Sequence, residues 1–157
     1  MYYDLHIHSA LSPCGDDTMT INNIFNMAYI KGLELIAITD HNSLKQQFYL
    51  EEIINHDILK GKIDYIHGVE LQSKEEIHIL AYFRKNTDLD IIQKWIDKHL
   101  IKVDNQPDYY GNQHIFNAND EIIETENNLL ISSLDLDVYE IVDNIHRFNG
   151  VAILAHV

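Results

Sequence analysis

The sequence is poor in positive charge and in long apolar runs, and each shortage excludes a class of protein. Only 11 Lys and Arg stand against 25 Asp and Glu, so the formal net charge is −14. Because a phosphate backbone is neutralised by Lys and Arg, this balance predicts no strong binding to duplex nucleic acid. No apolar run approaches the roughly 20 residues of a membrane helix, and the first four residues lack the basic start of a signal peptide. We therefore expect no membrane association and a cytoplasmic location.

Cysteine, proline and glycine are also scarce. The one cysteine, Cys14, excludes an internal disulfide framework and suits a reducing compartment. With 2 Pro, 6 Gly and 46% hydrophobic residues arranged in periodic runs, the chain is neither disordered nor collagen-like. Its length fits one globular domain, and we expect residues 1–157 to form a single unit.

Apolar periodicity predicts strands and helices in alternation. Residues 2–8 alternate as a strand does, which places Tyr3, Leu5 and Ile7 on one face. The other face then presents His6 and His8 together. Further strands are expected at 33–39, 62–70, 77–83 and 151–155, and helices at 20–32, 43–61, 88–102 and 137–148. This order favours an α/β fold with a largely parallel sheet or barrel.

Residues 103–135 break this rhythm, and we interpret them as an insertion. They are polar and turn-rich at first, then mix acidic residues with short apolar pairs, which favours a loop with a hairpin or a short helix. The chain later ends just after the apolar run 151–155, which we expect to be a buried strand. Since such a strand needs cover on both faces, we expect a C-terminally truncated piece of a longer protein. An uncovered apolar edge would also favour oligomers.

Side chains with metal-ligating chemistry gather at the predicted strand ends. In a parallel α/β barrel these ends face one mouth, where active sites lie. Two histidines spaced i, i+2 on a strand lie roughly 7 Å apart on one face, close enough to chelate one ion. Imidazole and carboxylate are ligands that Zn, Mn and Fe accept. The pattern predicts a divalent metal centre built from His6, His8, Asp40, His41, Glu70, His78 and His156.

Four motifs in order resemble those of the PHP (polymerase and histidinol phosphatase) family. They are DLHIHS at 4–9, TDHN at 39–42, GVE at 68–70 and AH at 155–156. The resemblance implies a distorted seven-stranded (β/α) barrel of TIM-like type, here without its last strands, and a centre of two or three Zn, Mn or Fe ions. It also implies hydrolysis of a phosphate mono- or diester by a metal-activated water. The expected substrate is a small anionic sugar, histidinol, nucleotide or oligonucleotide phosphate.

The resemblance also implies roles for single residues around two of the ions. His6 and His8 would hold the first ion. Glu70 would bridge from it to a second ion, which His78 and His156 would complete.

A third ion would take His41 together with a group from the loop after His8. For that group we favour Asp16, then Asp17, over the thiolate of Cys14. Asp40 would join His41 in the catalytic machinery by fixing the loop or an imidazole. The family's late Asp-x-His pair is missing from this sequence, which leaves the first and third sites each one ligand short.

Two other functions compete with phosphate-ester hydrolysis. One is a noncatalytic PHP module that binds metal for stability or docks on a partner. The other is a barrel amidohydrolase that cleaves C–N bonds, which shares the HxH pair and its placement. The intact ligand positions count against the first, and the TDHN and GVE motifs count against the second.

Overall fold

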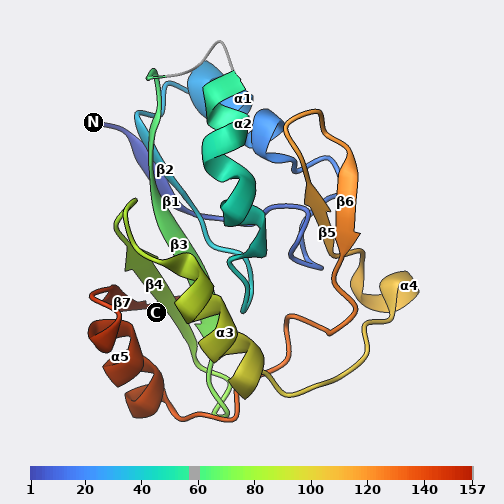
Figure 1. Cartoon of the computed structure of the whole chain (residues 1–157), viewed down its shortest axis with the longest axis vertical. Helices are drawn as coiled ribbons and strands as arrows, with labels where there is room; N and C mark the ends of the chain where they lie inside the picture. The colour runs from blue at the N-terminus through green and yellow to red at the C-terminus, as the bar shows by residue number, and fades with distance from the viewer. Residues whose placement is uncertain (57–60, 157) are drawn as a thin grey trace.

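The computed structural model describes residues 1–56 and 61–156, and its elements alternate along the chain (Figure 1). The strands are β1 (Tyr3–Ile7), β2 (Leu35–Ile38), β3 (Asp64–Gln72), β4 (His78–Phe83), β5 (His114–Phe116), β6 (Ile122–Thr125) and β7 (Val151–Leu154). The helices are α1 (Ile21–Ile30), the 3-10 turn η1 (Lys45–Tyr49), α2 (Leu50–His56), α3 (Leu89–His99), α4 (Pro107–Tyr110) and α5 (Val138–Arg147). Within the described residues, no helix combines the length and the apolar character that crossing a membrane requires.

Five strands form one sheet in the order β1-β2-β3-β4-β7. The first three are parallel, whereas β4 runs antiparallel to both β3 and β7. The reason is the short turn between β3 and β4, closed by a 3.0 Å hydrogen bond from the Ser73 N–H to the Ile77 carbonyl. So short a connection makes a hairpin, because a parallel pair needs a long crossover. The predicted α/β class is therefore confirmed with a mixed sheet, while the predicted barrel is not: the described strands form an open sheet.

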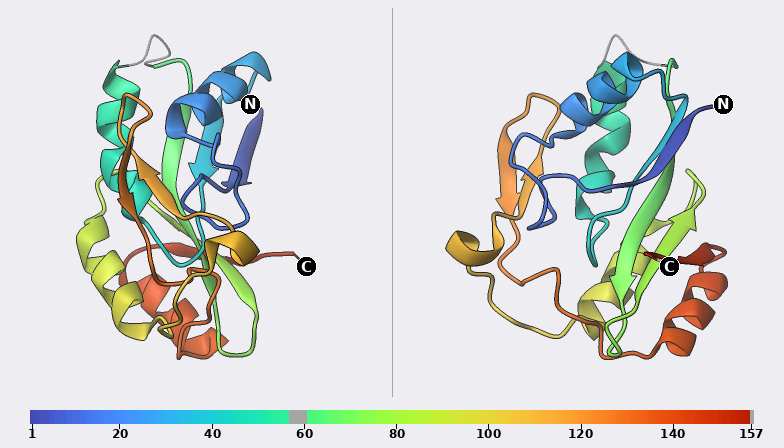
Figure 2. Two further views of the ribbon diagram at one scale, coloured as in Figure 1. Left: turned by 90° about the vertical axis from the view of Figure 1, so that its right-hand side faces the viewer. Right: turned by 180° about the vertical axis from the view of Figure 1, so that it is seen from behind.

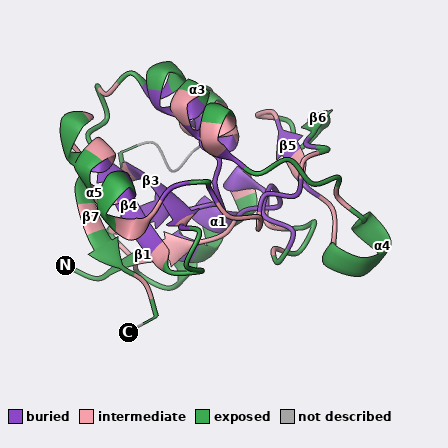
Figure 3. Cartoon of the chain, turned by 90° about the horizontal axis from the view of Figure 1, so that it is seen from below, coloured by how far each residue is buried: buried purple, intermediate pink, exposed green. Residues whose placement is uncertain are grey.

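The helices cover one face of this sheet. Helices α1 and α2 pack on β2, and α3 and α5 pack on β3 and β4, in two apolar clusters. The views in Figure 2 show these helices against the sheet, and Figure 3 shows their buried residues turned inward. The opposite face carries a smaller apolar cluster of Ala37, Leu80 and Tyr82. Glu70 lies on this second face as well, since it pairs with Leu80 in the register of β3 and β4.

Three helices begin at residues that cap them. Thr20 caps α1 and Asp88 caps α3 with their side-chain oxygens. Asp137 and Glu140 form a capping box at the start of α5. The helix predicted for 43–61 begins as the turn η1 and continues as α2. Residues 57–60 of the predicted range lie outside the described residues, as does Val157, and Gly61 lies in a turn.

A β-bulge alters the predicted alternation of β1. The pairing with β2 shifts between Asp4 and Ile7, and the Asp4 carboxylate accepts the His6 N–H at 3.1 Å. As a result Leu5 packs in the cluster on the helix-free face, whereas Ile7 packs under α1 and α2. The prediction that Leu5 and Ile7 share a face is wrong, because the extra residue of a bulge reverses the alternation.

The segment 103–135 contains α4 and the hairpin β5–β6, which stands beside the main sheet at the right of Figure 1. Its base is organised by Gln113, whose side chain is fully buried. The Gln113 amide donates to the carbonyls of Glu126 and Asn128 at 2.8 Å and accepts the Leu130 N–H at 2.8 Å. Ile115 from this segment joins the core cluster under α3 and α5.

Strand β7 differs from the buried strand predicted at 151–155. Val151, Ile153 and Leu154 are each about half exposed. The strand pairs only with β4, so it forms an edge of the described sheet.

We predict that Gln113→Ala lowers the free energy of unfolding by about 2–4 kcal/mol, because it leaves two buried carbonyls and one N–H without partners. Urea unfolding followed by circular dichroism measures this loss. Gln106→Ala is the matched control, since the exposed Gln106 makes no capping hydrogen bond at α4. Equal stability of the two variants would contradict the role given to Gln113.

Candidate metal centre

Five histidines and one glutamate converge at one end of the sheet. His6 is the next-to-last residue of β1 and His8 directly follows the strand, His41 follows β2, and Glu70 lies near the end of β3. His78 opens β4, and because β4 is antiparallel its first residue lies at the same end as the last residues of its neighbours. His156 follows β7 and completes the group. The topology thus brings together six residues that the sequence predicts as ligands.

Glu70 is the centre of this group, and its two oxygens face different histidines. Oε2 lies 3.1 Å from His6 Nε2, 3.0 Å from His8 Nε2 and 3.5 Å from His41 Nδ1. Oε1 lies 2.8 Å from His78 Nδ1 and 3.8 Å from His156 Nδ1. This is the division that a carboxylate bridging two ions requires, and it matches the roles implied by the resemblance.

The spacing of these atoms suits a metal ion. His6 Nε2 and His8 Nε2 are 3.2 Å apart, and each is about as far from Glu70 Oε2. A divalent ion with bonds of about 2.0–2.2 Å holds neighbouring ligand atoms about 3.0–3.5 Å apart. The Glu70 side chain is fully buried, and its ion-pair partners among the described residues are imidazoles only. The donor set therefore fits borderline divalent cations.

Asp40 and Ser12 fix the orientation of His8. The Ser12 hydroxyl donates to Asp40 Oδ1 at 2.7 Å, and its oxygen lies 3.1 Å from His8 Nδ1. Since the hydroxyl has one proton and the carboxylate takes it, His8 Nδ1 is the donor of the second bond. The free lone pair of His8 is then on Nε2, which faces Glu70.

The same hydrogen bonds hold the loop after β1. Asp40 also accepts the N–H and the hydroxyl of Ser9, at 2.7 and 2.6 Å. The Ser12 oxygen also accepts the backbone N–H of His41 at 3.1 Å. Asp40 is buried, and its carboxylate oxygens are hydrogen-bonded to Ser9 and Ser12 of this loop.

Burial and neighbouring imidazoles shift the pKa values of three groups at the site. Burial raises the pKa of Glu70, but the hydrogen bond that His8 donates when Nε2 is also protonated, together with the nearness of the other imidazoles, outweighs it, so the pKa of Glu70 lies well below the usual range. Burial and the nearby His8 lower the pKa of His41 to about 4. Burial also raises the pKa of Asp40, against the effect of its serine donors. At neutral pH Glu70 is thus an anion and His41 a neutral ligand.

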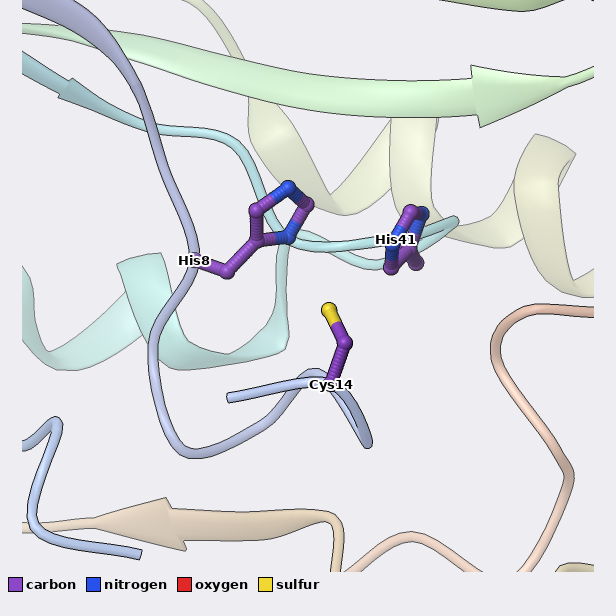
Figure 4. A group of neighbouring side chains, drawn as sticks. All are labelled: His8, Cys14 and His41. Carbon is purple, nitrogen blue, oxygen red and sulfur yellow. The ribbon is translucent and has the colours of Figure 1, made fainter. Parts of the chain in front are cut away.

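The loop after His8 places Cys14, and not Asp16 or Asp17, beside the histidines. Ligand atoms of His8, Cys14 and His41 lie within 4.8 Å of one another, and Figure 4 shows the sulfur directed toward the two rings. The Asp16 carboxylate instead accepts the N–H and hydroxyl of Thr18.

The Asp17 carboxylate accepts the Asn112 amide at 2.8 Å, away from the cluster. The predicted preference for Asp16 and Asp17 is therefore reversed by the structure, because local turn hydrogen bonds and the hairpin segment engage both carboxylates. Burial raises the pKa of the Cys14 thiol, which keeps it protonated until a cation displaces the proton.

Three other histidines make their side-chain contacts outside the cluster. His67 is buried under the helices against Gln47, at 2.9 Å. His99 pairs with Asp135, and His114 pairs with the Thr125 hydroxyl in the hairpin.

Two residues that organise the site were not singled out from the sequence. Ser12 is one of them, and no pattern marks it apart from its place four residues after His8. The other is Asn42, which is fully buried and donates to the carbonyls of Leu130 and Ser132 at 2.8 and 2.7 Å. A left-handed φ of 45° at Asn42 is the conformation that asparagine tolerates better than most residues. It ties the site to the segment 103–135.

Solved structures share this fold. The lesion-specific endonuclease Q of Pyrococcus furiosus superposes with a TM-score of 0.62 and 23% identity, over 98% of this chain and 34% of that chain. Endonuclease Q in complex with a 27-mer duplex substrate, with an abasic lesion at the active site, gives a TM-score of 0.59 and 22% identity, over 96% of this chain and 33% of that chain. The chain thus spans about a third of the length of these solved chains. No curated protein matches the sequence.

One of these structures corrects a prediction made from charge. The expectation of no strong binding to duplex nucleic acid is contradicted, because endonuclease Q, with this fold, is solved on a 27-mer duplex. Net charge averages over the whole surface, whereas binding depends on the local field at the site.

The family comparison agrees with the four motifs and with the site geometry. The PHP domain family matches residues 4–151. Since that match covers nearly the whole sequence, this chain belongs to the PHP domain family.

Proposed function

We propose that this chain is a metal-dependent hydrolase of phosphate esters, with ions held on both sides of Glu70. The observation that carries the proposal is the division of the Glu70 oxygens between two sets of histidines. His6 and His8 would hold one ion, and His78 and His156 the other. When bound, such ions supply Lewis acidity: they neutralise phosphoryl charge and make a water acidic enough to attack at neutral pH.

The chain's own residues prepare the site for this chemistry. Asp40 and Ser12 hold His8 in the tautomer that presents Nε2 to Glu70, so no reorientation is needed on binding. Glu70 remains ionised because imidazoles surround it, and one carboxylate can then serve two ions.

The substrate is a phosphate ester whose negative charge the ions offset. In the described residues Glu70 pairs with no lysine or arginine, so the acidic centre draws its positive charge from metal. Endonuclease Q, which shares the fold, is solved in complex with a 27-mer duplex substrate that has an abasic lesion at the active site. We therefore propose that diesters, including those of nucleic acid strands, be tested beside monoesters.

We predict that the chelator-treated chain takes up at least two divalent ions and then hydrolyses an aryl phosphate mono- or diester with Mn or Zn. Glu70→Gln removes the bridging charge, so we expect it to lower turnover roughly 100-fold or more and to reduce bound metal. Mass spectrometry of metal content and release of the aryl alcohol measure the two effects. Glu75→Gln is the matched control, since Glu75 is exposed on the turn before β4.

The outcomes separate the competing functions. Bound metal without turnover of either ester would overturn the hydrolase and favour a noncatalytic metal-binding module. Turnover of an amide in place of the esters would favour a C–N hydrolase. Failure to bind any divalent ion would overturn the metal centre itself.

We also predict a pH-dependent loss of stability in the metal-free chain that depends on His41. Its pKa is about 4 in the folded chain and near 6.5 when unfolded, so between these values the unfolded chain binds the extra proton. Stability is therefore highest above pH 6.5 and falls toward pH 4, by at most a little over about 3 kcal/mol from this residue.

Urea unfolding at several pH values measures this effect. His41→Gln is expected to flatten the slope between pH 6.5 and 4. His146→Gln, on the exposed side of α5, is the matched control and keeps the slope. Parallel pH profiles for the original chain and His41→Gln would contradict the shift.

A further inference from the structure

Cys14 occupies the corner of a rigid turn. The Ser12 carbonyl accepts the Gly15 N–H at 2.8 Å, so residues 12–15 form a β-turn with Pro13 at its second position. A side chain on Gly15 would approach the Ser9 carbonyl oxygen to 2.3 Å, so the turn folds closely over the loop. Ser12, the first residue of the turn, is itself bonded to the buried Asp40. Ser9, Ser12, Gly15 and Asp40 thus fix the position of the turn that carries the Cys14 thiol.

The thiol faces two imidazoles. A ligand atom of Cys14 lies within 4.8 Å of one from His8 and one from His41. Figure 4 shows the three side chains arriving from separate segments, with the sulfur turned toward the rings. A metal thiolate bond of about 2.3 Å and imidazole bonds of about 2.0–2.1 Å span such distances after small side-chain adjustments.

His41 provides an independent sign that a ligand belongs here. The residue is only 8% exposed, and its buried Nδ1 has no hydrogen-bond partner among the described residues. Buried polar atoms are nearly always satisfied, and an unsatisfied one marks a group awaiting a partner. Its backbone N–H is bonded to Ser12, the same residue that holds the Cys14 turn and His8. One serine therefore sets the positions of all three side chains.

His8 serves only one ion at a time. Its Nδ1 donates to Ser12, which leaves the single lone pair of Nε2, and that atom is 3.0 Å from Glu70. Cys14 is therefore the side chain that distinguishes this position from the pair of ions on Glu70, since His41 Nδ1 also lies 3.5 Å from Glu70 Oε2. A thiolate is a softer ligand than the imidazoles and carboxylate around Glu70.

We propose that Cys14, as a thiolate, ligates a divalent ion together with His41 beside the Glu70 centre, and that this sulfur makes the position prefer zinc over manganese. This role of Cys14 rests on the proposed function. It means that the ion beside Cys14 and the ions on Glu70 differ in metal preference. On binding, the thiol loses its proton to solvent and the sulfur lone pair forms the metal bond, so uptake of the ion releases a proton.

The test uses cobalt as a spectroscopic probe of the full chain. Because Cys14 is the one cysteine, any near-ultraviolet sulfur-to-cobalt charge-transfer band reports this residue alone. We expect the chelator-treated chain to develop the band on titration with Co²⁺ and to lose it when Zn²⁺, but not Mn²⁺, is added. Cys14→Ser should abolish the band and weaken binding of one zinc ion by roughly 10- to 100-fold.

Two further variants complete the design. Asp17→Asn is the matched control in the same loop and should keep the band, since Asp17 bonds to Asn112 instead. His41→Gln should weaken the band together with zinc binding. Circular dichroism of each variant shows that it is folded, and the reactivity of the thiol toward a disulfide reagent should fall when zinc is bound.

Each result separates this inference from the proposed function. Cobalt uptake with ester hydrolysis but without a charge-transfer band would overturn the role of Cys14 and leave the Glu70 centre standing. Equal thiol reactivity with and without zinc would overturn it too. No metal uptake at all would overturn both proposals.

Discussion

The buried carboxylate of Asp40 is the constraint on which the site depends. Among the residues that the structure describes, Asp40 forms no ion pair, and three donors from Ser9 and Ser12 satisfy it at 2.6–2.7 Å. A buried charge is costly unless it is hydrogen-bonded, so these donors cannot turn away without loss of stability. The loop after β1 is therefore held against the end of β2. Through Ser12 the same bonds set His8, the backbone of His41 and the turn that carries Cys14.

Glu70 plays the complementary part on the other side of the cluster. It sits near the end of a central strand, where its neighbours β2 and β4 bring histidines from both directions. The antiparallel course of β4 matters here, because it places the first residue of that strand, His78, beside the last residues of the parallel ones. The buried Glu70 carboxylate is an anion with imidazoles at both oxygens, and the proposed ions would neutralise its charge.

Much of this arrangement could be predicted from the sequence. Residues His6, His8, His41, Glu70, His78 and His156 were expected together because each lies at the end of a predicted strand, and strand ends share an edge of a sheet. The starts of the helices predicted at 20 and 137 agree with the structure, where Thr20 and Asp137 cap them through local hydrogen bonds that need no tertiary context. That these residues bind ions stays a prediction.

The parts that could not be predicted depend on contacts between distant segments. The direction of β4 follows from a five-residue turn that periodicity does not describe, and the bulge in β1 adds one residue that no pattern shows. Asp16 looked the better ligand than Cys14 by chemistry alone. The turn at 12–15 and the partner of Asp17 in the segment 103–135 decide otherwise. Likewise the apolar run 151–155 suggested burial, whereas its place at an edge leaves it half exposed.

The most direct test of the account is anomalous X-ray scattering from crystals of this chain grown with zinc and with manganese. Data collected at the absorption edge of each metal locate its ions independently of any activity. The account predicts anomalous peaks within bonding distance of both Glu70 oxygens, with histidines of the cluster completing each ion. Peaks confined to surface histidines such as His146, or a cluster without any peak, would contradict it.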